Sequence, residues 1–334
     1  MVNIVIIGCG SITEFRHAPE CYDSKKINLV GFFDVNFERA SEFAKKYNCK
    51  AFESYQDVLN DPEVDGVILC VNNKYHCDMT VQALRHKKHV LCEKPISVTL
   101  EEAQEMIKTS EEEQRYLMIA HNQRLEAVNR KLKEVLTTRD LGKILTFNTA
   151  FTHSGPERWS VEKTNKTWFL NKKEAGLGAL GDIGIHKADV IRWLIGEEFK
   201  YVTARTATLD KKDAEGNYIA IEDNAFAILE SESGIMGTLE AGWTAYGKGK
   251  NGTMICCEKG VVETEGAKRV IVHYKNGEKE FLEVKQGQSL IAETFADCIA
   301  NAIQPEISGV EGMKALEIVL ACIKSSEEHV RVEL

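Results

Sequence analysis

A tight glycine turn between a buried strand and a helix most constrains how this chain can fold. The apolar run 2–7 leads into Gly8-Cys9-Gly10-Ser11-Ile12-Thr13, and an amphipathic stretch over 11–24 follows directly. The two glycines permit a sharp turn and let another molecule approach the backbone closely. The pattern predicts the first strand–turn–helix unit of a doubly wound sheet, with a helix N-terminus that can hold a phosphate group.

The same alternation continues through the first third of the chain. Continuously apolar strands separated by helices indicate a parallel sheet that is covered on both faces. Because parallel strands need right-handed crossovers, we predict a Rossmann domain over residues 1–122. Its expected strands are 2–7, 28–33, 64–71, 89–92 and 116–120, and its expected helices are 11–24, 36–47, 76–87 and 99–114.

After about residue 122 the pattern changes to strands that are joined by tight turns. Turn sequences such as Glu232-Ser233-Gly234 and Lys275-Asn276-Gly277 favour antiparallel pairing. We therefore predict a second, α+β domain over 123–334 with a large, open, mostly antiparallel sheet. Its expected helices are 126–138, 289–303 and 310–328, and its expected strands are 143–153, 199–209, 222–231, 234–243, 252–257, 260–264, 269–274 and 279–284.

Composition argues against several classes of protein. The net charge is −9 with both signs interspersed, which is untypical of nucleic-acid binders and of proteins that bind anionic membranes. No apolar run approaches the ~20 residues of a membrane span, and the strand at 2–7 is not preceded by a signal peptide. The ten cysteines form no Cys-x-x-Cys pair. We expect free thiols, no metal site and a cytoplasmic location.

A carboxylate completes the first candidate site. Asp34 ends the second predicted strand, where it would accept hydrogen bonds from both hydroxyls of an adenosine ribose. The same carboxylate would repel the 2′-phosphate of NADP, so NAD is the expected cofactor in preference to NADP. The predicted dinucleotide-binding residues at this end of the sheet are Gly8, Gly10, Ser11, Ile12 and Asp34.

A lysine marks a second candidate site. Glu93-Lys94-Pro95 follows the strand 89–92, and ligands of open α/β sheets bind at the carboxyl ends of the strands. Pro95 fixes the turn, and the ammonium of Lys94 could hydrogen-bond a substrate oxygen and stabilise the charge that develops on it. A solvated lysine at a strand end is the alternative that the pattern leaves open.

A glycine-rich segment leads to a third candidate site. Residues 176–184 precede a helix that runs to Gly196, and Asp182 and His186 lie four residues apart at its start, which predicts one shared face. Histidine suits a general base at neutral pH, and an adjacent carboxylate would orient it and raise its basicity. A structural histidine is the competing interpretation.

Taken in order, Gly8-x-Gly10, Asp34, Glu93-Lys94-Pro95 and Asp182-x-x-x-His186 resemble the glucose–fructose oxidoreductase / inositol dehydrogenase (Gfo/Idh/MocA) family. The resemblance extends over nearly the whole chain. It implies a Rossmann domain followed by a domain whose exposed sheet face joins subunits, as a homodimer or homotetramer. It also implies that Lys94 and His186 are catalytic and that Asp182 supports them.

The resemblance adds residues to the expected cofactor site. Asn73 and His76 correspond to a cofactor-contacting segment, Glu93 belongs to the lysine motif, and Asn122 and Arg124 correspond to a segment near the nicotinamide. The chain departs from the pattern at two positions. Asn72 stands where the family usually has proline, and Thr13 stands where a third glycine would be.

The predicted reaction is hydride transfer between nicotinamide and a carbinol carbon of a sugar, cyclitol or related polyol. His186 would take the hydroxyl proton, Lys94 would position the oxygen, and Asp182 would orient the pair. Four residues are candidates for the sugar pocket, and plain core and surface positions are the competing interpretation: His153, Arg158, Trp159 and Trp168. Two alternatives stay open, an oxidoreductive glycoside hydrolase with tightly bound NAD and a non-enzymatic NAD-binding regulator.

Overall fold

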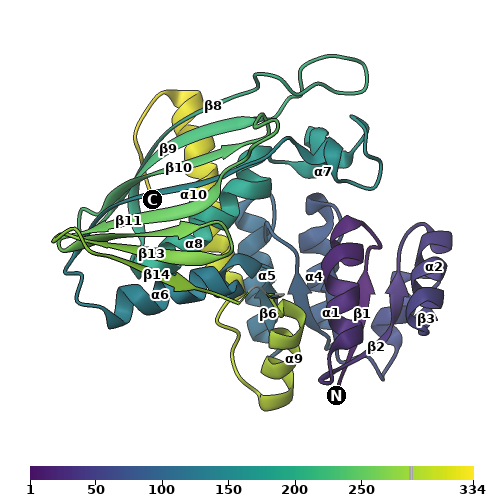
Figure 1. Ribbon diagram of the computed structural model, residues 1–334. Coiled ribbons are helices and arrows are strands. Elements are labelled where there is room, and N and C mark those ends of the chain that lie inside the picture. Colours follow the sequence, from purple (N-terminus) through teal and green to yellow (C-terminus); the bar gives the residue numbers. More distant parts are fainter. Residues whose placement is uncertain (286, 288) are drawn as a thin grey trace.

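A six-stranded parallel sheet forms the first part of the protein in the computed structural model, which describes residues 1–285, 287 and 289–334 (Figure 1). The strand order is β3-β2-β1-β4-β5-β6, and every neighbouring pair is parallel. The order reverses between β1 and β4, which places a ligand crevice at their carboxyl ends. The strands are β1 (Val2–Ile7), β2 (Ile27–Phe33), β3 (Lys50–Ala51), β4 (Gly66–Leu69), β5 (His89–Cys92) and β6 (Leu117–Ile119).

Helices cover this sheet as the Rossmann prediction requires, which confirms the fold class of the first part. The side chain of Asn36 caps α2, and a reciprocal Thr99–Glu102 capping box begins α5. Short α3 and β3 were not expected, and a π-helical turn, Thr13–His17, precedes α1. The helices are α1 (Ala18–Asp23), α2 (Phe37–Tyr47), α3 (Tyr55–Asn60), α4 (His76–Arg85) and α5 (Leu100–Glu112).

A nine-stranded sheet forms the second part, in the order β14-β13-β12-β11-β7-β10-β9-β8-β15. Among the described strands of this second sheet, only β7 and β10 pair in parallel, which confirms a mostly antiparallel sheet. Gly234 and Gly277 have φ of 92° and 93° in the expected turns. The strands are β7 (Ile144–Thr152), β8 (Phe199–Ala207), β9 (Asn224–Ser231), β10 (Met236–Gly242), β11 (Asn251–Cys257), β12 (Gly260–Glu265), β13 (Arg269–Tyr274), β14 (Lys279–Glu283) and β15 (Val332–Glu333).

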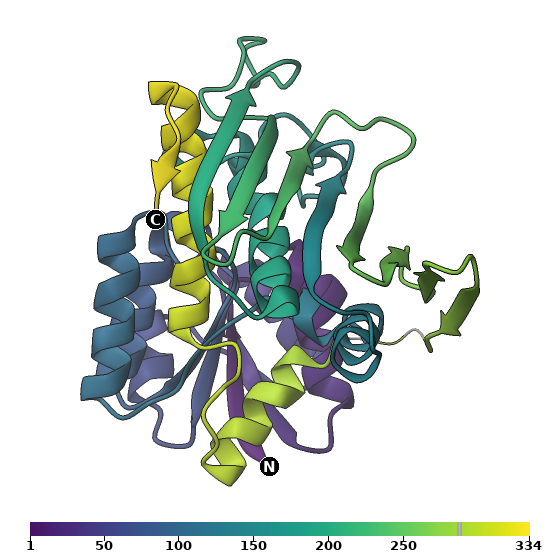
Figure 2. The same ribbon diagram turned by 90° about the vertical axis from the view of Figure 1, so that its left-hand side faces the viewer.

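Helices pack between the two sheets and along the second one. The long helix α10 contacts β8, α8 and α5, and Figure 2 shows it running beside the large sheet. The helix α9 instead packs against the first sheet, where Phe295 joins the buried cluster around Ile4 and Ile68. The range 123–334 therefore also supplies helices that pack on the first sheet, since α10 contacts β6 as well. These helices are α6 (Ala127–Thr138), α7 (Lys172–Ala175), α8 (Ile185–Ile195), α9 (Ile291–Asn301) and α10 (Gly309–Glu328). Across the described residues, no helix is long and apolar enough to cross a membrane.

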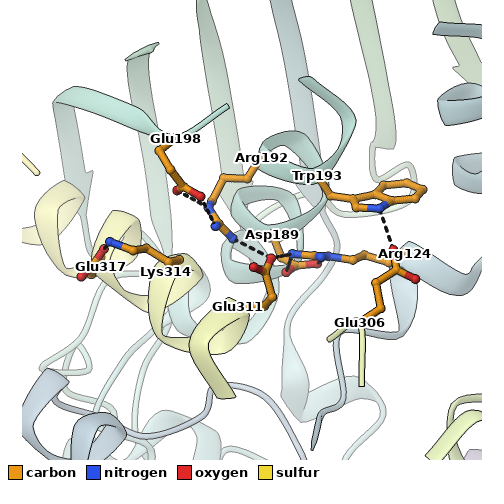
Figure 3. Close-up of polar contacts among 9 residues, drawn as sticks. All are labelled: Arg124, Asp189, Arg192, Trp193, Glu198, Glu306, Glu311, Lys314 and Glu317. Atoms are coloured by element: carbon orange, nitrogen blue, oxygen red, sulfur yellow. Dashed lines mark hydrogen bonds and ion pairs between the residues drawn. The ribbon is translucent and has the colours of Figure 1, made fainter. Parts of the chain in front are cut away.

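A buried ion pair fixes α8 against the junction between the two sheets (Figure 3). Arg124, in the short helical turn after β6, donates two hydrogen bonds to Asp189 on α8, at 2.7 and 2.6 Å. The two side chains are 3% and 0% exposed. Glu311 on α10 accepts a further bond from Arg124 and lies 3.3 Å from Arg192. Three elements are thus held at one point.

We expect the variant Asp189→Asn to lower the free energy of unfolding by about 3 kcal/mol or more, because it leaves the buried Arg124 with one charged partner fewer. Denaturant-induced unfolding measures this loss. The matched control is Asp140→Asn, whose carboxylate pairs with Lys259 at the surface and whose removal should cost less than about 1 kcal/mol. Equal small losses in both variants would contradict the clamping role of the Arg124–Asp189 pair.

Candidate active site

The glycine turn after β1 has the shape that a phosphate needs. Gly8 has a φ of 92°, and a Cβ added there would lie 2.3 Å from the carbonyl oxygen of Cys70. A Cβ on Gly10 would meet nothing within 4 Å, so the space beside this glycine is open. Thr13 donates a hydrogen bond of 2.6 Å to the carbonyl of Gly8 and closes the turn. The departure at Thr13 therefore preserves the geometry of the dinucleotide motif.

Asp34 lies beside this turn at the carboxyl end of β2. Its Oδ2 accepts a 2.7 Å hydrogen bond from the backbone of Cys9, and its Oδ1 accepts one of 2.8 Å from the backbone of Asn36. Half-buried Ser11 and Ile12 begin the helical segment that follows the glycines. The structure thus brings together the five residues that were predicted for the adenosine half of the cofactor.

Glu93 links the helical turn that follows the glycines to the end of β5, where Lys94 lies. Its Oε1 lies 2.7 Å from Nε2 of the buried His17, and its Oε2 accepts a 3.2 Å bond from the backbone of Lys94. Burial alone would raise the pKa of Glu93, but the hydrogen bond and charge of His17, with that of Lys94, lower it to about 2. Because a carboxylate can only accept, Nε2 of His17 carries the hydrogen. The sequence pattern had not indicated His17.

Asn73 and His76 fasten the loops around the crevice. Asn73 donates a 2.8 Å hydrogen bond to the carbonyl of Ala175. The ring of His76 is fully buried, with Nδ1 2.7 Å from the carbonyl of Pro95 and Nε2 3.1 Å from that of Val71. Burial lowers the pKa of His76. These contacts hold the turn that carries Lys94, and a direct contact of either side chain with NAD stays a prediction.

Lys94 and Asp182 meet where the two parts of the protein face each other. The Nζ of Lys94 lies 2.9 Å from Oδ1 of Asp182 and 2.7 Å from its carbonyl oxygen. The other carboxylate oxygen accepts a 3.1 Å bond from Nε1 of Trp243, a fully buried side chain that follows β10. The Lys94 side chain is 15% exposed and that of Asp182 is 6% exposed. Sequence reasoning had not indicated Trp243, because a lone tryptophan after a strand is typical of a core.

His186 lies at the start of α8, but its expected partnership with Asp182 is not the one that forms. The described residues contain no hydrogen bond between them, since Asp182 is bonded to Lys94 and Trp243. The four-residue spacing rule applies to an α-helix, whereas Asp182 lies in a π-helical turn, Leu180–Gly184. Burial, followed by the charge of Lys94, lowers the pKa of His186 well below its usual value. The imidazole is therefore neutral at physiological pH.

Asn122 and Arg124 have different hydrogen-bond partners in the structure. Asn122 is buried, donates a 3.4 Å bond to Glu126, and lines with Arg16 a pocket of about 380 Å³. The guanidinium of Arg124 is bound to Asp189 and Glu311 in the buried cluster of Figure 3. That the segment of Asn122 and Arg124 lies near the nicotinamide stays a prediction.

Two of the four candidate pocket residues reach the site. Nδ1 of His153 accepts a 2.9 Å bond from the backbone of Gly155, which leaves the hydrogen on Nε2, 3.9 Å from Asp182. The Trp159 ring packs edge-on against His153, with 6.4 Å between centroids. Trp168 stacks on Phe169, and Phe169 in turn packs against Trp159. Arg158 is exposed.

A buried carboxylate supports the glycine-rich segment that carries Asp182. Oε1 of Glu222 accepts hydrogen bonds of 3.0 Å from the backbones of Gly178 and Leu180. A Cβ on Gly178 would lie 1.9 Å from the carbonyl of Glu222, so this close approach requires glycine. Burial raises the pKa of Glu222 to about 7, although the two backbone bonds oppose the shift.

Comparison with known proteins agrees with this arrangement. Residues 2–121 match the oxidoreductase family with an NAD-binding Rossmann fold, and residues 129–263 match the GFO/IDH/MocA C-terminal domain. The chain belongs to the Gfo/Idh/MocA family of oxidoreductases. The predicted resemblance is confirmed.

Relatives of this family member act on sugars and cyclitols. The myo-inositol 2-dehydrogenase of Thermotoga maritima is 27% identical over 345 residues, which cover 100% of this chain and 98% of that protein. The glucose-6-phosphate 3-dehydrogenase of Bacillus subtilis is 32% identical over 229 residues, 67% of this chain and 63% of the relative, so less than two thirds of that relative is matched. A 2,7-anhydro-N-acetylneuraminate hydratase of Escherichia coli is 27% identical over 276 residues, 81% of this chain and 70% of that protein.

A solved structure shares the fold over the full length. Levoglucosan dehydrogenase, in complex with NADH and levoglucosan, superposes with a TM-score of 0.89 at 21% identity and covers 100% of this chain and 99% of that one. The relatives are thus mainly NAD(P)-dependent dehydrogenases of sugar hydroxyls, and the family also contains hydratases.

In this Gfo/Idh/MocA protein, we expect Glu222 to make stability depend on pH. Its pKa is raised on folding, so its contribution is fully present below about pH 4.5, its unfolded value, and is lost as the pH rises through about 7. Relative to Glu222→Gln, the wild type should lose on the order of 3 kcal/mol at most between pH 5 and pH 8. Urea unfolding at both pH values tests this, and an equal pH dependence of the two proteins would contradict it.

Proposed function

We propose that this protein is an NAD-dependent dehydrogenase that transfers a hydride between nicotinamide and a carbinol or carbonyl carbon of a sugar, cyclitol or related polyol. One observation carries the proposal. The ammonium of Lys94 is held by Asp182 at the carboxyl end of β5, on the same edge of the sheet as the open glycine turn and beside the neutral His186. Ligands of open α/β sheets bind at this edge.

Each residue of the site has its own role in the proposed reaction. NAD supplies the hydride acceptor when it is bound. His186, held neutral by burial, takes the hydroxyl proton. Lys94 donates a hydrogen bond to the same oxygen and stabilises the negative charge that develops on it. Asp182 keeps the ammonium in place by two contacts, and Trp243 holds the carboxylate in turn.

The substrate assay tests this proposal together with one variant. A panel of cyclitols, aldoses and glycosides with NAD⁺ should give NADH absorbance with at least one member. Lys94→Met should lower kcat by at least ~10²-fold, because the charge on the oxygen loses its stabilising ammonium. NADH affinity, followed by fluorescence, should stay within about threefold. An unchanged kcat in Lys94→Met would remove this residue from the mechanism.

The proposed cofactor is NAD in preference to NADP. Asp34 is fixed by the backbones of Cys9 and Asn36 and so cannot easily turn away from a 2′-phosphate. At an effective dielectric constant of 20, like charges ~4 Å apart repel by about 4 kcal/mol before screening. The nearest cation in the sequence is Arg39, on the first turn of α2.

We expect kcat/KM to favour NAD over NADP by at least ~10-fold, about 1.4 kcal/mol. Asp34→Ser should narrow or reverse this preference with little change in kcat at saturating cofactor, because the repelling charge is removed. Arg39→Gln serves as the control and should leave the preference for NAD in place. If the wild type uses both cofactors equally well, Arg39 rather than Asp34 dominates the contact.

A redox-neutral reaction is the second candidate. The hydratase among the relatives supports it, since transient oxidation by bound NAD can activate a neighbouring bond for elimination. An oxidoreductive glycoside hydrolase would work in the same way. Consumption of a glycoside without net NADH production would favour this candidate. A non-enzymatic regulator has weaker support, because the chain has both Lys94 and His186 and the charge of Lys94 acts on His186.

The outer face of the large sheet is the proposed subunit interface. Large apolar side chains are exposed there, including Phe226 at 57% and Ile228 at 49% on β9 and Met236 at 49% on β10. Patches of this kind mark interfaces. We expect a dimer or tetramer by light scattering, and Ile228→Lys should shift the protein toward monomer while NADH still binds. A monomeric wild type would contradict this assignment.

A reducing compartment, the cytoplasm, is the proposed location. All ten cysteines are free in the described structure, and most are buried among apolar side chains. Thiols of this kind persist where glutathione keeps proteins reduced.

A further inference from the structure

The general base proposed above lacks the partner that such a base needs. For Nε2 of a neutral histidine to accept a proton, the ring hydrogen must lie on Nδ1, and an acceptor usually fixes it there. Nδ1 of His186 is enclosed and has no hydrogen-bond partner in the part of the chain that the structure describes, whereas Nε2 is not among these enclosed atoms. Asp182 is bonded elsewhere.

The charged groups that act on His186 cannot serve as acceptors. Lys94, Arg16 and Lys187 are cations that only donate hydrogen bonds. The Phe151 ring, 6.3 Å away between centroids, offers no lone pair in its plane. The other ring that packs against His186 among the described residues is that of His121, which stands at 84° to it with 6.2 Å between the centroids.

His121 is itself an unused buried side chain. It is 0% exposed, and neither ring nitrogen has a hydrogen-bond partner among the described residues. Unpaired polar atoms in such a place destabilise the folded protein. Burial lowers the pKa of His121, and the charges of Arg124, Lys94 and Arg192 add to this effect against that of Asp189. The ring is therefore neutral and keeps one nitrogen free to accept.

The distance between the two rings suits an indirect contact. Centroids 6.2 Å apart leave the nitrogens too far apart for a direct hydrogen bond. A buried water needs two to four polar partners. One enclosed nitrogen of each ring supplies two, because the two nitrogens of a single ring point in different directions.

The buried ion pair fixes this arrangement. Arg124 lies three residues after His121, and Asp189 lies three residues after His186. Their two hydrogen bonds, 2.7 and 2.6 Å long, hold the turn after β6 against α8. The two imidazoles are therefore carried by elements that are clamped to each other.

We propose that His121 is a positioning residue that accepts the Nδ1 hydrogen of His186 through one buried water. The contact keeps Nε2 of His186 free of hydrogen and directed to the substrate hydroxyl. When His186 takes the substrate proton on Nε2, the Nδ1 hydrogen stays in its bond, so no proton passes to His121. The inference rests on the proposed function for the role of His186 as a base.

Histidine ¹⁵N NMR tests the contact without any substrate. In the wild-type holoprotein with NADH, we expect the ring of His186 to carry its hydrogen on Nδ1, with the signal assigned by its loss in His186→Gln. His121→Phe keeps a flat ring without nitrogens and should move the hydrogen to Nε2 or mix the two forms. His121→Gln supplies an amide acceptor and should keep it on Nδ1. An unchanged tautomer in His121→Phe would overturn the inference.

Kinetics with an active sugar supplies the second readout. His121→Phe should lower kcat by about 10-fold or more, while KM and NADH affinity stay within about twofold. His121→Gln should recover most of the rate, which a merely structural role would not predict. Equal losses in both variants, or no loss in either, would overturn the inference. His121→Leu replaces the phenylalanine variant if that protein does not fold. A wild type that is inactive on every sugar would contradict the proposed function. The NMR result would still show whether His121 fixes the tautomer of His186.

Discussion

The hydrogen bond between Lys94 and Asp182 is the interaction on which the rest of the site depends. It joins the end of a Rossmann strand to a π-helical turn of the second part of the chain, over 2.9 Å. Lysine is a flexible point charge, so its catalytic use requires that something else fix its position. Asp182 does this with its carboxylate and its backbone carbonyl, and Trp243 fixes the carboxylate.

Buried contacts of charged side chains set the two sides of this bond. On the Rossmann side, Glu93 ties the strand end of Lys94 to His17, on the helix that follows the glycine turn. On the other side, Asp189 ties α8 to Arg124. Breaking such pairs leaves an uncompensated charge in a dry environment, so these contacts constrain geometry strongly. Under the proposed function, these contacts would keep Lys94 in position when a cofactor and a polyol bind.

The sequence allowed the Rossmann fold and the mostly antiparallel second sheet to be predicted, because both follow from local periodicity and turn residues. It also placed Lys94 and Asp34, since strand ends in a parallel sheet share one edge. The expected contact between Asp182 and His186 does not form, because Asp182 lies in a π-helical turn, to which the four-residue spacing of an α-helix does not apply. Contacts between distant segments bring three further residues to the site, and the local sequence pattern therefore did not indicate them: His121, Trp243 and Glu222. The packing of α9 on the first sheet also depends on contacts between distant segments, so the local pattern did not predict it.

Deuterium transfer tests the central claim, hydride transfer at this crevice, most directly. The protein is incubated with NAD⁺ and with sugars and cyclitols that carry deuterium on every carbon, and the nicotinamide is examined by NMR and mass spectrometry. The account predicts deuterium at C4 of the nicotinamide, on one face of the ring, and its absence when Lys94→Met replaces the wild type. Conversion of a sugar without any deuterium at C4 would contradict the account.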